Sequence, residues 1–241
     1  MRFAFRFRPI PFIAALIVAI IGILLGNWQQ GRAAYKTELQ MQQRERGAQA
    51  PVELGPTIAA SDDLAFRRVH VRGEFVANWP IFLANRPMGS QSGFYLAMPF
   101  KIAGSDMHVL VLRGWLPRQA EFGKLPPFAT PAGPILLEGR VVASSGRVME
   151  LGEGPPVAPG AQVQNLATQE LARASGLALQ PFLVQQTAPA TADDQLQREW
   201  PAPDAGIDKH RGYAFQWYAL AALAVLFYVM TGFRRGSGKT D

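Results

Sequence analysis

Residues 9–26 read PIPFIAALIVAIIGILLG, and these eighteen positions contain no charged side chain. As an α-helix they would rise about 27 Å, close to the thickness of the hydrocarbon core of a bilayer. Residues 213–233, YAFQWYALAALAVLFYVMTGF, form a second uncharged run near the other end of the chain. Because an isolated run of this length satisfies its backbone hydrogen bonds in lipid only as a helix, both runs are predicted to span a membrane.

The first run follows Arg2, Arg6 and Arg8, a basic start that is also typical of cleaved signal peptides. Two features argue against cleavage. The run exceeds the roughly 7 to 15 apolar residues of a signal peptide, and GNWQQGR, residues 26–32, follows it in place of an A-x-A site. The segment is therefore predicted to be an uncleaved membrane anchor.

The formal charge of +6 comes entirely from residues that flank the two apolar runs. Between Gln29 and Lys209 the chain has 17 Lys and Arg residues and 17 Asp and Glu residues, so this segment is neutral overall. A nucleic acid partner is therefore not expected. The short basic tails favour a cytoplasmic position for both termini, which in a bacterium would place the central segment in the periplasm.

The chain is predicted to consist of seven segments in a simple order. They are a cytoplasmic basic N-terminus (1–8), a first transmembrane helix (9–28), a helical stalk (29–50), a β-rich periplasmic domain (51–188), a linker (189–209), a second transmembrane helix (210–233) and a cytoplasmic tail (234–241). The stalk is expected to continue the first helix, because residues 31–49 contain many good helix formers and few β-branched residues.

The central segment alternates between apolar and polar side chains in several short stretches. In FRRVHVRGEFV, residues 66–76, Val69, Val71 and Phe75 would share one face of a strand. Pro80 cannot donate a ladder hydrogen bond, so the next strand is predicted at a sheet edge or beginning at Ile81. The predicted strands are 66–76, 79–84, 94–102, 108–116, 135–143 and 182–187.

A helix is predicted at residues 166–175, with Thr168 at its start and Gly176 as its C-cap residue. The spacing of the strands favours an antiparallel sheet or a small barrel with one or two helices. The predicted fold class is thus a membrane protein in which N- and C-terminal transmembrane α-helices bracket a mainly β extracytoplasmic domain.

Residues suited to catalysis are sparse in this sequence. There is no cysteine, and no two of the three histidines lie at a metal-binding spacing such as H-x-x-x-H. No nucleophile elbow, Walker loop or dinucleotide fingerprint occurs. His70 and His108 are predicted at the surface or rim of the sheet, and the carboxylate pairs Asp62–Asp63 and Asp193–Asp194 in solvated turns. An enzyme is not expected, and a membrane-tethered hydrolase is the least favoured alternative.

His210 stands at the start of the second apolar run. On a helix it shares a face with Tyr213, Ala214 and Trp217. An imidazole beside aromatic and small residues at the membrane surface is suited to ligating a haem iron. The alternative is an interfacial aromatic belt that includes one polar residue at the lipid headgroups. Gln216, about one turn below the membrane surface, is expected to face another helix or a cavity.

Gly22 and Gly26 form a G-x-x-x-G pair that would let a partner helix approach closely. The simplest arrangement packs the two apolar helices against each other. That packing would bring Trp28, Gln29 and Arg32 level with His210 and Trp217.

Several short motifs follow one another along the chain in a distinctive order. They are Gly26-Asn-Trp28-Gln29 with Arg32 and Lys36, Arg68-Val69 with Gly73 and Phe75, Gly93, Pro99-Phe100, Val109-Leu-Val-Leu-Arg113-Gly114-Trp115-Leu-Pro117, Leu137-Glu138-Gly139, and His210 with Tyr213-Ala214, Trp217 and Ala219. Nearly end to end, this pattern resembles the surfeit-locus (Surf/Shy-type) assembly factors for cytochrome c oxidase. The chain departs from the family pattern at Leu112, Asp208 and Arg211, where the family usually has Asn, Asn and Leu.

The resemblance implies a non-catalytic role in oxidase assembly, and bacterial members are associated with haem a and its insertion into oxidase subunit I. His210 occupies the position of the proposed haem ligand, and Arg32 and Arg211 are candidates for pairing with haem propionates. The predicted haem a site comprises His210, Trp28, Gln29, Arg32, Tyr213, Gln216 and Trp217.

Oxidase subunit I and membrane lipid are the expected partners, with haem a synthase as a further candidate. The expected location is the bacterial cytoplasmic (inner) membrane. The alternative function is a cofactor-free membrane scaffold that stabilises an oxidase assembly intermediate through its periplasmic β-domain.

Overall fold

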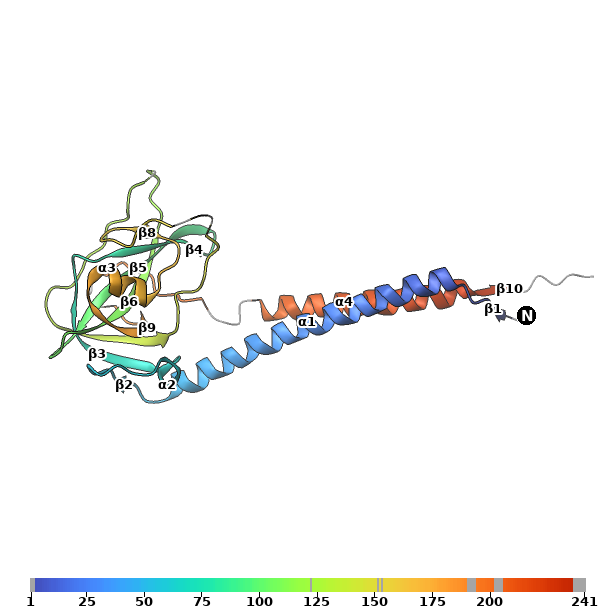
Figure 1. Cartoon of the computed structure of the whole chain (residues 1–241), viewed down its shortest axis with the longest axis horizontal. Coiled ribbons are helices and arrows are strands. Elements are labelled where there is room, and N and C mark those ends of the chain that lie inside the picture. The colour runs from blue at the N-terminus through green and yellow to red at the C-terminus, as the bar shows by residue number, and fades with distance from the viewer. Residues whose placement is uncertain are drawn as a thin grey trace, which may run out of the picture. The chain divides into compact units, whose positions relative to one another are not determined.

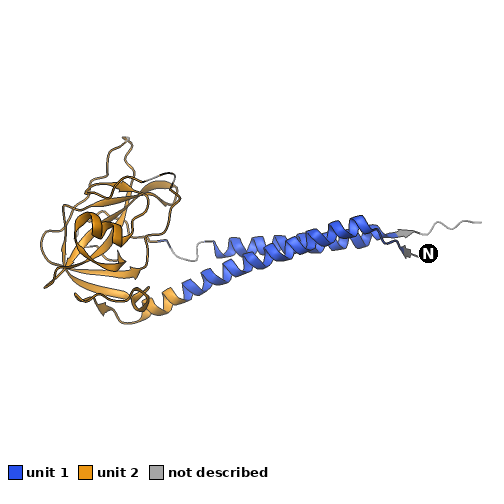
Figure 2. Ribbon diagram, viewed as in Figure 1, with its two compact units in different colours: residues 1–41, 201–241 blue, residues 42–200 orange. Residues whose placement is uncertain are grey.

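The chain divides into two compact units, one of residues 1–41 and 201–241 and one of residues 42–200 (Figure 2). The computed structural model describes residues 3–121, 123–150, 152, 154–189, 194–201 and 206–235. The first unit is built from two long helices, and the second is built mainly from strands (Figure 1).

Helix α1 spans Pro9–Ala48, and helix α4 spans Ile207–Gly232. The segments predicted as a first transmembrane helix and a stalk are thus parts of one continuous helix, while α4 begins three residues before the predicted start at 210. Both helices are long and apolar enough to cross a membrane, and only 17% and 11% of their apolar windows are buried. That exposure distinguishes them from core helices of a water-soluble domain.

Helices α1 and α4 pack along faces of mostly small residues, which follow one another at steps of three, four and seven positions in α1 and of seven and eleven positions in α4. A Cβ atom on Gly22 would lie 2.8 Å from the Trp217 carbonyl oxygen, and one on Gly26 would meet the ring of Tyr218. The predicted close approach at these glycines is therefore confirmed. The buried positions of the two helices are Ala19, Gly22, Gly26 and Ala33 in α1 and Ile207, Ala214, Ala221 and Gly232 in α4.

A short two-stranded ribbon joins the N-terminal end of α1 to the C-terminal end of α4. Strand β1 (Phe3–Phe5) pairs antiparallel with β10 (Phe233–Arg235), and the Arg6 backbone N–H donates to the Gly232 carbonyl oxygen at 2.9 Å. The N-terminus of α1 and the C-terminus of α4 consequently lie at the same end of the pair (Figure 1). This pairing has no counterpart among the sequence predictions.

The second unit contains one eight-stranded sheet. Its strands are β2 (Val52–Glu53), β3 (Arg68–Phe75), β4 (Ile81–Met88), β5 (Gln91–Ile102), β6 (Met107–Pro117), β7 (Ile135–Val142), β8 (Gln162–Val163) and β9 (Ala178–Gln186). All six predicted strands are present, and β4 begins at Ile81, directly after Pro80. The two-residue strands β2 and β8 and the one-turn helix α2 (Ser61–Leu64) were not predicted.

The sheet closes into a small barrel. Its order is β2-β3-β7-β9-β6-β5-β4-β8, and an additional pairing of β3 with β5 joins strands β3, β7, β9, β6 and β5 into a ring. The closing register matches Gly73 with Ile102 and Phe75 with Phe100. Within the ring β6 and β9 run parallel, whereas the other neighbours are antiparallel.

Helix α3 (Thr168–Ser175) begins with Thr168, and Ala167 takes the N-cap position with its N–H donating to Glu170 Oε2 at 3.3 Å. Gly176 follows the helix with a φ of 72°, which confirms it as the C-cap residue. In β3 the predicted alternation is also confirmed, because Val69, Val71 and Phe75 are buried.

Two surface predictions are wrong. His108 is only 6% exposed, because β6 lies between β5 and β9 and is covered on both faces. The Asp194 side chain is 3% exposed, since it forms an ion pair with Arg198 and accepts the Leu196 backbone N–H at 3.1 Å. Asp62 and Asp63 are exposed as predicted, although on α2, and Asp193 lies outside the described residues.

Candidate functional site

The central feature of the helix pair is a polar contact between the two helices. His210 Nδ1, near the start of α4, lies 2.7 Å from Gln29 Oε1 on α1. Because an amide oxygen only accepts hydrogen bonds, Nδ1 carries the ring proton and donates it to Gln29. In the neutral ring Nε2 then keeps its lone pair, which is the tautomer that second-shell partners select in metal-ligating histidines.

The residues of α4 that surround His210 on the face toward α1 are apolar. Ile207 precedes it and Ala214 follows it, and both are buried. Trp217 is half-buried one turn further along α4. The imidazole is therefore partly exposed beside two buried apolar residues of the same helix.

The remaining predicted site residues lie on the outside of the helix pair. Trp28 and Tyr213, which neighbour Gln29 and His210 along their helices, are 58% and 52% exposed. Arg32 is also exposed. Gln216 does not face α1, because its side chain is exposed on α4. The structure thus brings His210 and Gln29 together, leaves Trp217 half-buried further along α4, and leaves the other four on accessible faces.

A second hydrogen bond joins α1 and α4 close to the contact between His210 and Gln29. The Tyr218 hydroxyl donates to Asn27 Oδ1 at 2.7 Å. The sequence did not predict this contact, because a helical wheel does not reveal which polar groups of two separate helices will meet. Together the two contacts determine how α1 and α4 align along their axes.

The β unit holds a buried cation that sequence reasoning did not single out as functional. Arg113 on β6 is fully buried, and its guanidinium donates to the Ala129 carbonyl oxygen at 2.8 Å and to Thr130 Oγ1 at 3.1 Å. It also lies over the Phe75 ring, 4.5 Å from the centroid. Burial lowers the pKa of Arg113 to about 10, so the group stays protonated at neutral pH. The available signal was a charged residue within an otherwise apolar strand.

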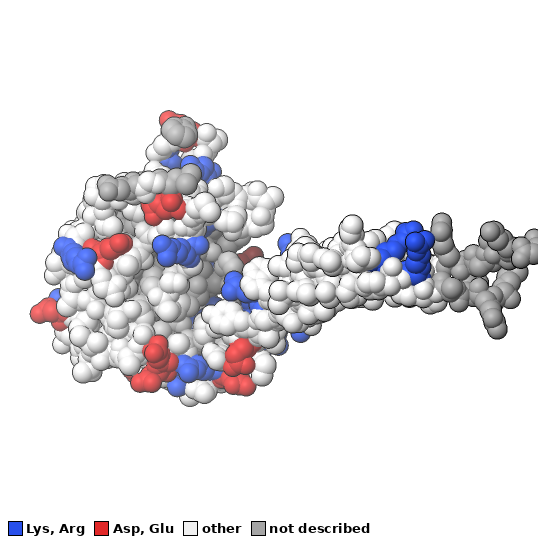
Figure 3. Space-filling model, turned by 45° about the vertical axis from the view of Figure 1, so that its right-hand side comes forward, with Lys and Arg blue, Asp and Glu red and all other residues white. Residues whose placement is uncertain are grey.

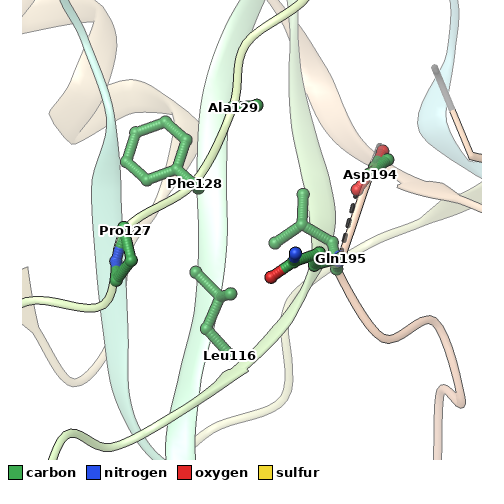
Figure 4. A pocket seen from close by; sticks show the side chains of 7 residues that line it. Leu116, Pro127, Phe128, Ala129, Asp194 and Gln195 are labelled. Carbon is green, nitrogen blue, oxygen red and sulfur yellow. Dashed lines mark hydrogen bonds between the residues drawn. The ribbon is translucent and has the colours of Figure 1, made fainter. Parts of the chain in front are cut away.

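A cavity of about 340 Å³ lies beside the loop that Arg113 holds (Figure 4). Leu116, Phe128 and Leu196 contribute apolar surface, and Asp194 and Gln195 contribute the polar groups. Across the described residues, no three His, Asp or Glu side chains lie close enough to hold a metal ion. The strongest candidate site for a metal-containing ligand is therefore the single histidine at the helix pair.

The fold and this site define a class of protein: two membrane-length helices that bracket a small closed β-barrel, with one histidine presented from the helix seam. The sequence model of the SURF1 family matches residues 16–222, and the chain belongs to this family. The predicted family resemblance is thereby confirmed.

Several relatives cover most of the chain. A SURF1-like protein of Rickettsia bellii (strain RML369-C) is 29% identical over 90% of this chain and 88% of its own length. The human Surfeit locus protein 1 is 24% identical over 92% of this chain and 77% of its own length. The Cytochrome oxidase assembly protein SHY1 of Saccharomyces cerevisiae (strain ATCC 204508 / S288c) is 29% identical over 40% of this chain and 25% of its own length.

Proposed function

We propose that this chain is a non-catalytic assembly factor for a haem-copper cytochrome c oxidase in the cytoplasmic membrane of a bacterium. Membership of the SURF1 family and the name of the yeast relative support a role in oxidase assembly. The basic residues that flank both spans support cytoplasmic termini and a periplasmic β domain. In this proposal the partner is oxidase subunit I, and haem a synthase is the candidate source of haem.

The finer part of the proposal is that the helix pair carries haem a as transient cargo, with His210 as the single protein ligand. The hydrogen bond from His210 Nδ1 to Gln29 is the observation that carries it, because it leaves Nε2 free to donate its lone pair to an iron. A single ligand on an accessible edge suits a carrier that must release its cargo.

Other residues near His210 have side chains that suit a haem. The exposed rings of Trp28 and Tyr213 offer apolar surface to a porphyrin. The exposed guanidinium groups of Arg32 and Arg211 match the geometry of carboxylates such as haem propionates. Arg211 Nη1 lies 3.9 Å from Asp208 Oδ1. This ion pair is exposed and weak, so the guanidinium stays accessible.

Replacing His210 by alanine is expected to remove the bound haem. The full chain, purified after co-expression with haem a synthesis, should carry haem, and the His210→Ala variant should carry at least tenfold less. Tyr218→Phe is the matched control, because it breaks the other interhelical hydrogen bond without touching the ligand. Absorbance spectra and extracted haem content give the comparison.

Equal haem content in the wild-type chain and His210→Ala would reject this ligand. A colourless wild-type chain that still co-purifies with oxidase subunit I would instead support the cofactor-free scaffold.

Replacing Gln29 by leucine should weaken haem binding without abolishing it. The Nδ1 proton would lose its acceptor and the ring its orientation, and loss of such a partner typically weakens metal binding about 10- to 100-fold. Gln29→Glu, which keeps an acceptor at the same reach, should retain binding. Spectroscopic titration of the purified variants with haem measures the effect, and unchanged affinity in Gln29→Leu would contradict the positioning role.

A further inference from the structure

An apolar groove runs between α1 and α4 at the end of the pair where β1 meets β10. Its volume is about 260 Å³, and Pro11, Ala14 and Val18 line it from α1. Ala224, Phe227, Tyr228 and Thr231 belong to its α4 wall. From Pro11 to Val18 a helix rises about 10 Å, so the groove matches a segment of an extended acyl chain.

Basic residues stand at one end of this groove. Arg8 directly precedes α1, three residues before Pro11, and the backbone of Arg6 is bonded to Gly232 at the end of α4. The side chains of Arg6 and Arg8 are exposed. Two further arginines, Arg234 and Arg235, belong to β10. Figure 3 shows basic side chains at this end of an otherwise uncharged stretch of the helix pair.

The positive potential at this end comes from the side chains and not from the helix dipoles. The N-terminus of α1 and the C-terminus of α4 lie together, so their partial charges have opposite signs and largely cancel. No acidic residue occurs in residues 3–8 or 232–235 to neutralise the arginines. An anion at the mouth of the groove would therefore be attracted by the guanidinium groups of Arg6 and Arg8.

We propose that this end of the helix pair binds one anionic phospholipid, with its phosphate at Arg6 and Arg8 and an acyl chain in the groove between Pro11 and Thr231. Of the two apolar grooves along the described parts of α1 and α4, this one lies next to the arginines. A second groove, about 540 Å³, has its α1 wall at Ala19 and Ile23. Ala19 follows Arg8 by eleven residues, a helical rise of about 16 Å, which is too far for the same headgroup contact.

Native mass spectrometry of the full-length chain, titrated with dioleoyl phosphatidylglycerol or dioleoyl phosphatidylcholine, tests the proposal. Binding of the anionic lipid should saturate at one molecule per chain and exceed binding of the zwitterionic lipid. Arg8→Gln should weaken phosphatidylglycerol binding about fivefold, the equivalent of about 1 kcal/mol for one basic residue at the membrane surface. Ala14→Leu should reduce binding of both lipids by filling the groove.

Two matched control variants distinguish the loss of this site from the loss of any arginine on α1 or the filling of any groove between the helices. Arg44→Gln removes an exposed arginine elsewhere on α1, and Ala222→Leu fills the second groove. Both should bind phosphatidylglycerol like the wild type. Equal binding of the two lipids, unchanged binding in Arg8→Gln and Ala14→Leu, or an equal loss in the controls would each overturn the proposal.

Discussion

Replacing Arg113 by alanine is expected to destabilise the β unit by about 3–5 kcal/mol. The substitution opens a cavity in the barrel and leaves the Ala129 carbonyl oxygen and the Thr130 hydroxyl without their donor. It also removes the contact between the guanidinium and the Phe75 ring. The loop that carries Phe128–Thr130 would lose its main attachment to β6.

Arg113→Met is the matched variant, because it keeps most of the buried volume and removes the charge. A buried charge carries a desolvation penalty, here visible in the lowered pKa of Arg113, and a neutral side chain of similar shape relieves it. The methionine variant should therefore lose less than half as much stability as the alanine variant. Chemical unfolding of the full chain in detergent, followed by hydrogen exchange at residues 128–130, measures both. Equal losses would show that packing contributes little and the hydrogen bonds contribute most.

Replacing Gly73 by valine should prevent the barrel from closing. Gly73 pairs with Ile102 at the junction of β3 and β5, and a Cβ atom there would collide with the Lys101 carbonyl oxygen. A backbone atom cannot rotate away, so the two strands would have to separate. The expected loss is more than about 4 kcal/mol, a magnitude that single substitutions reach only through a specific structural conflict.

Gly55→Val is the control for Gly73→Val, because no atom lies within 4 Å of the position of its Cβ. This surface change should alter the free energy of unfolding by no more than about 0.5 kcal/mol. Amide exchange should rise throughout β3 and β5 in the Gly73 variant alone. Protected β3 and β5 amides in Gly73→Val would contradict the role of this glycine in closure.

The site could be predicted in part. The apolar face that His210 shares with Ala214 and Trp217 follows from helical spacing, and Gly22 and Gly26 marked the face of α1 that meets α4. The partner of His210 did not follow from spacing alone, because Gln29 lies 181 positions earlier in the chain. Trp28, Tyr213 and Gln216 belong to the predicted set but lie on exposed faces, and their role in haem binding stays a prediction.

By itself the sequence determined the features that depend on neighbouring residues: two membrane-length helices, the alternation within the strands, the start of β4 after Pro80 and the C-cap at Gly176. Tertiary structure decided closure of the barrel, the burial of His108, and the ion pair of Asp194 with Arg198. The physical reason is the distance along the chain over which each interaction acts. Hydropathy and backbone preference act within a few residues, whereas closure, burial and side-chain partners depend on segments that only the folded chain brings together.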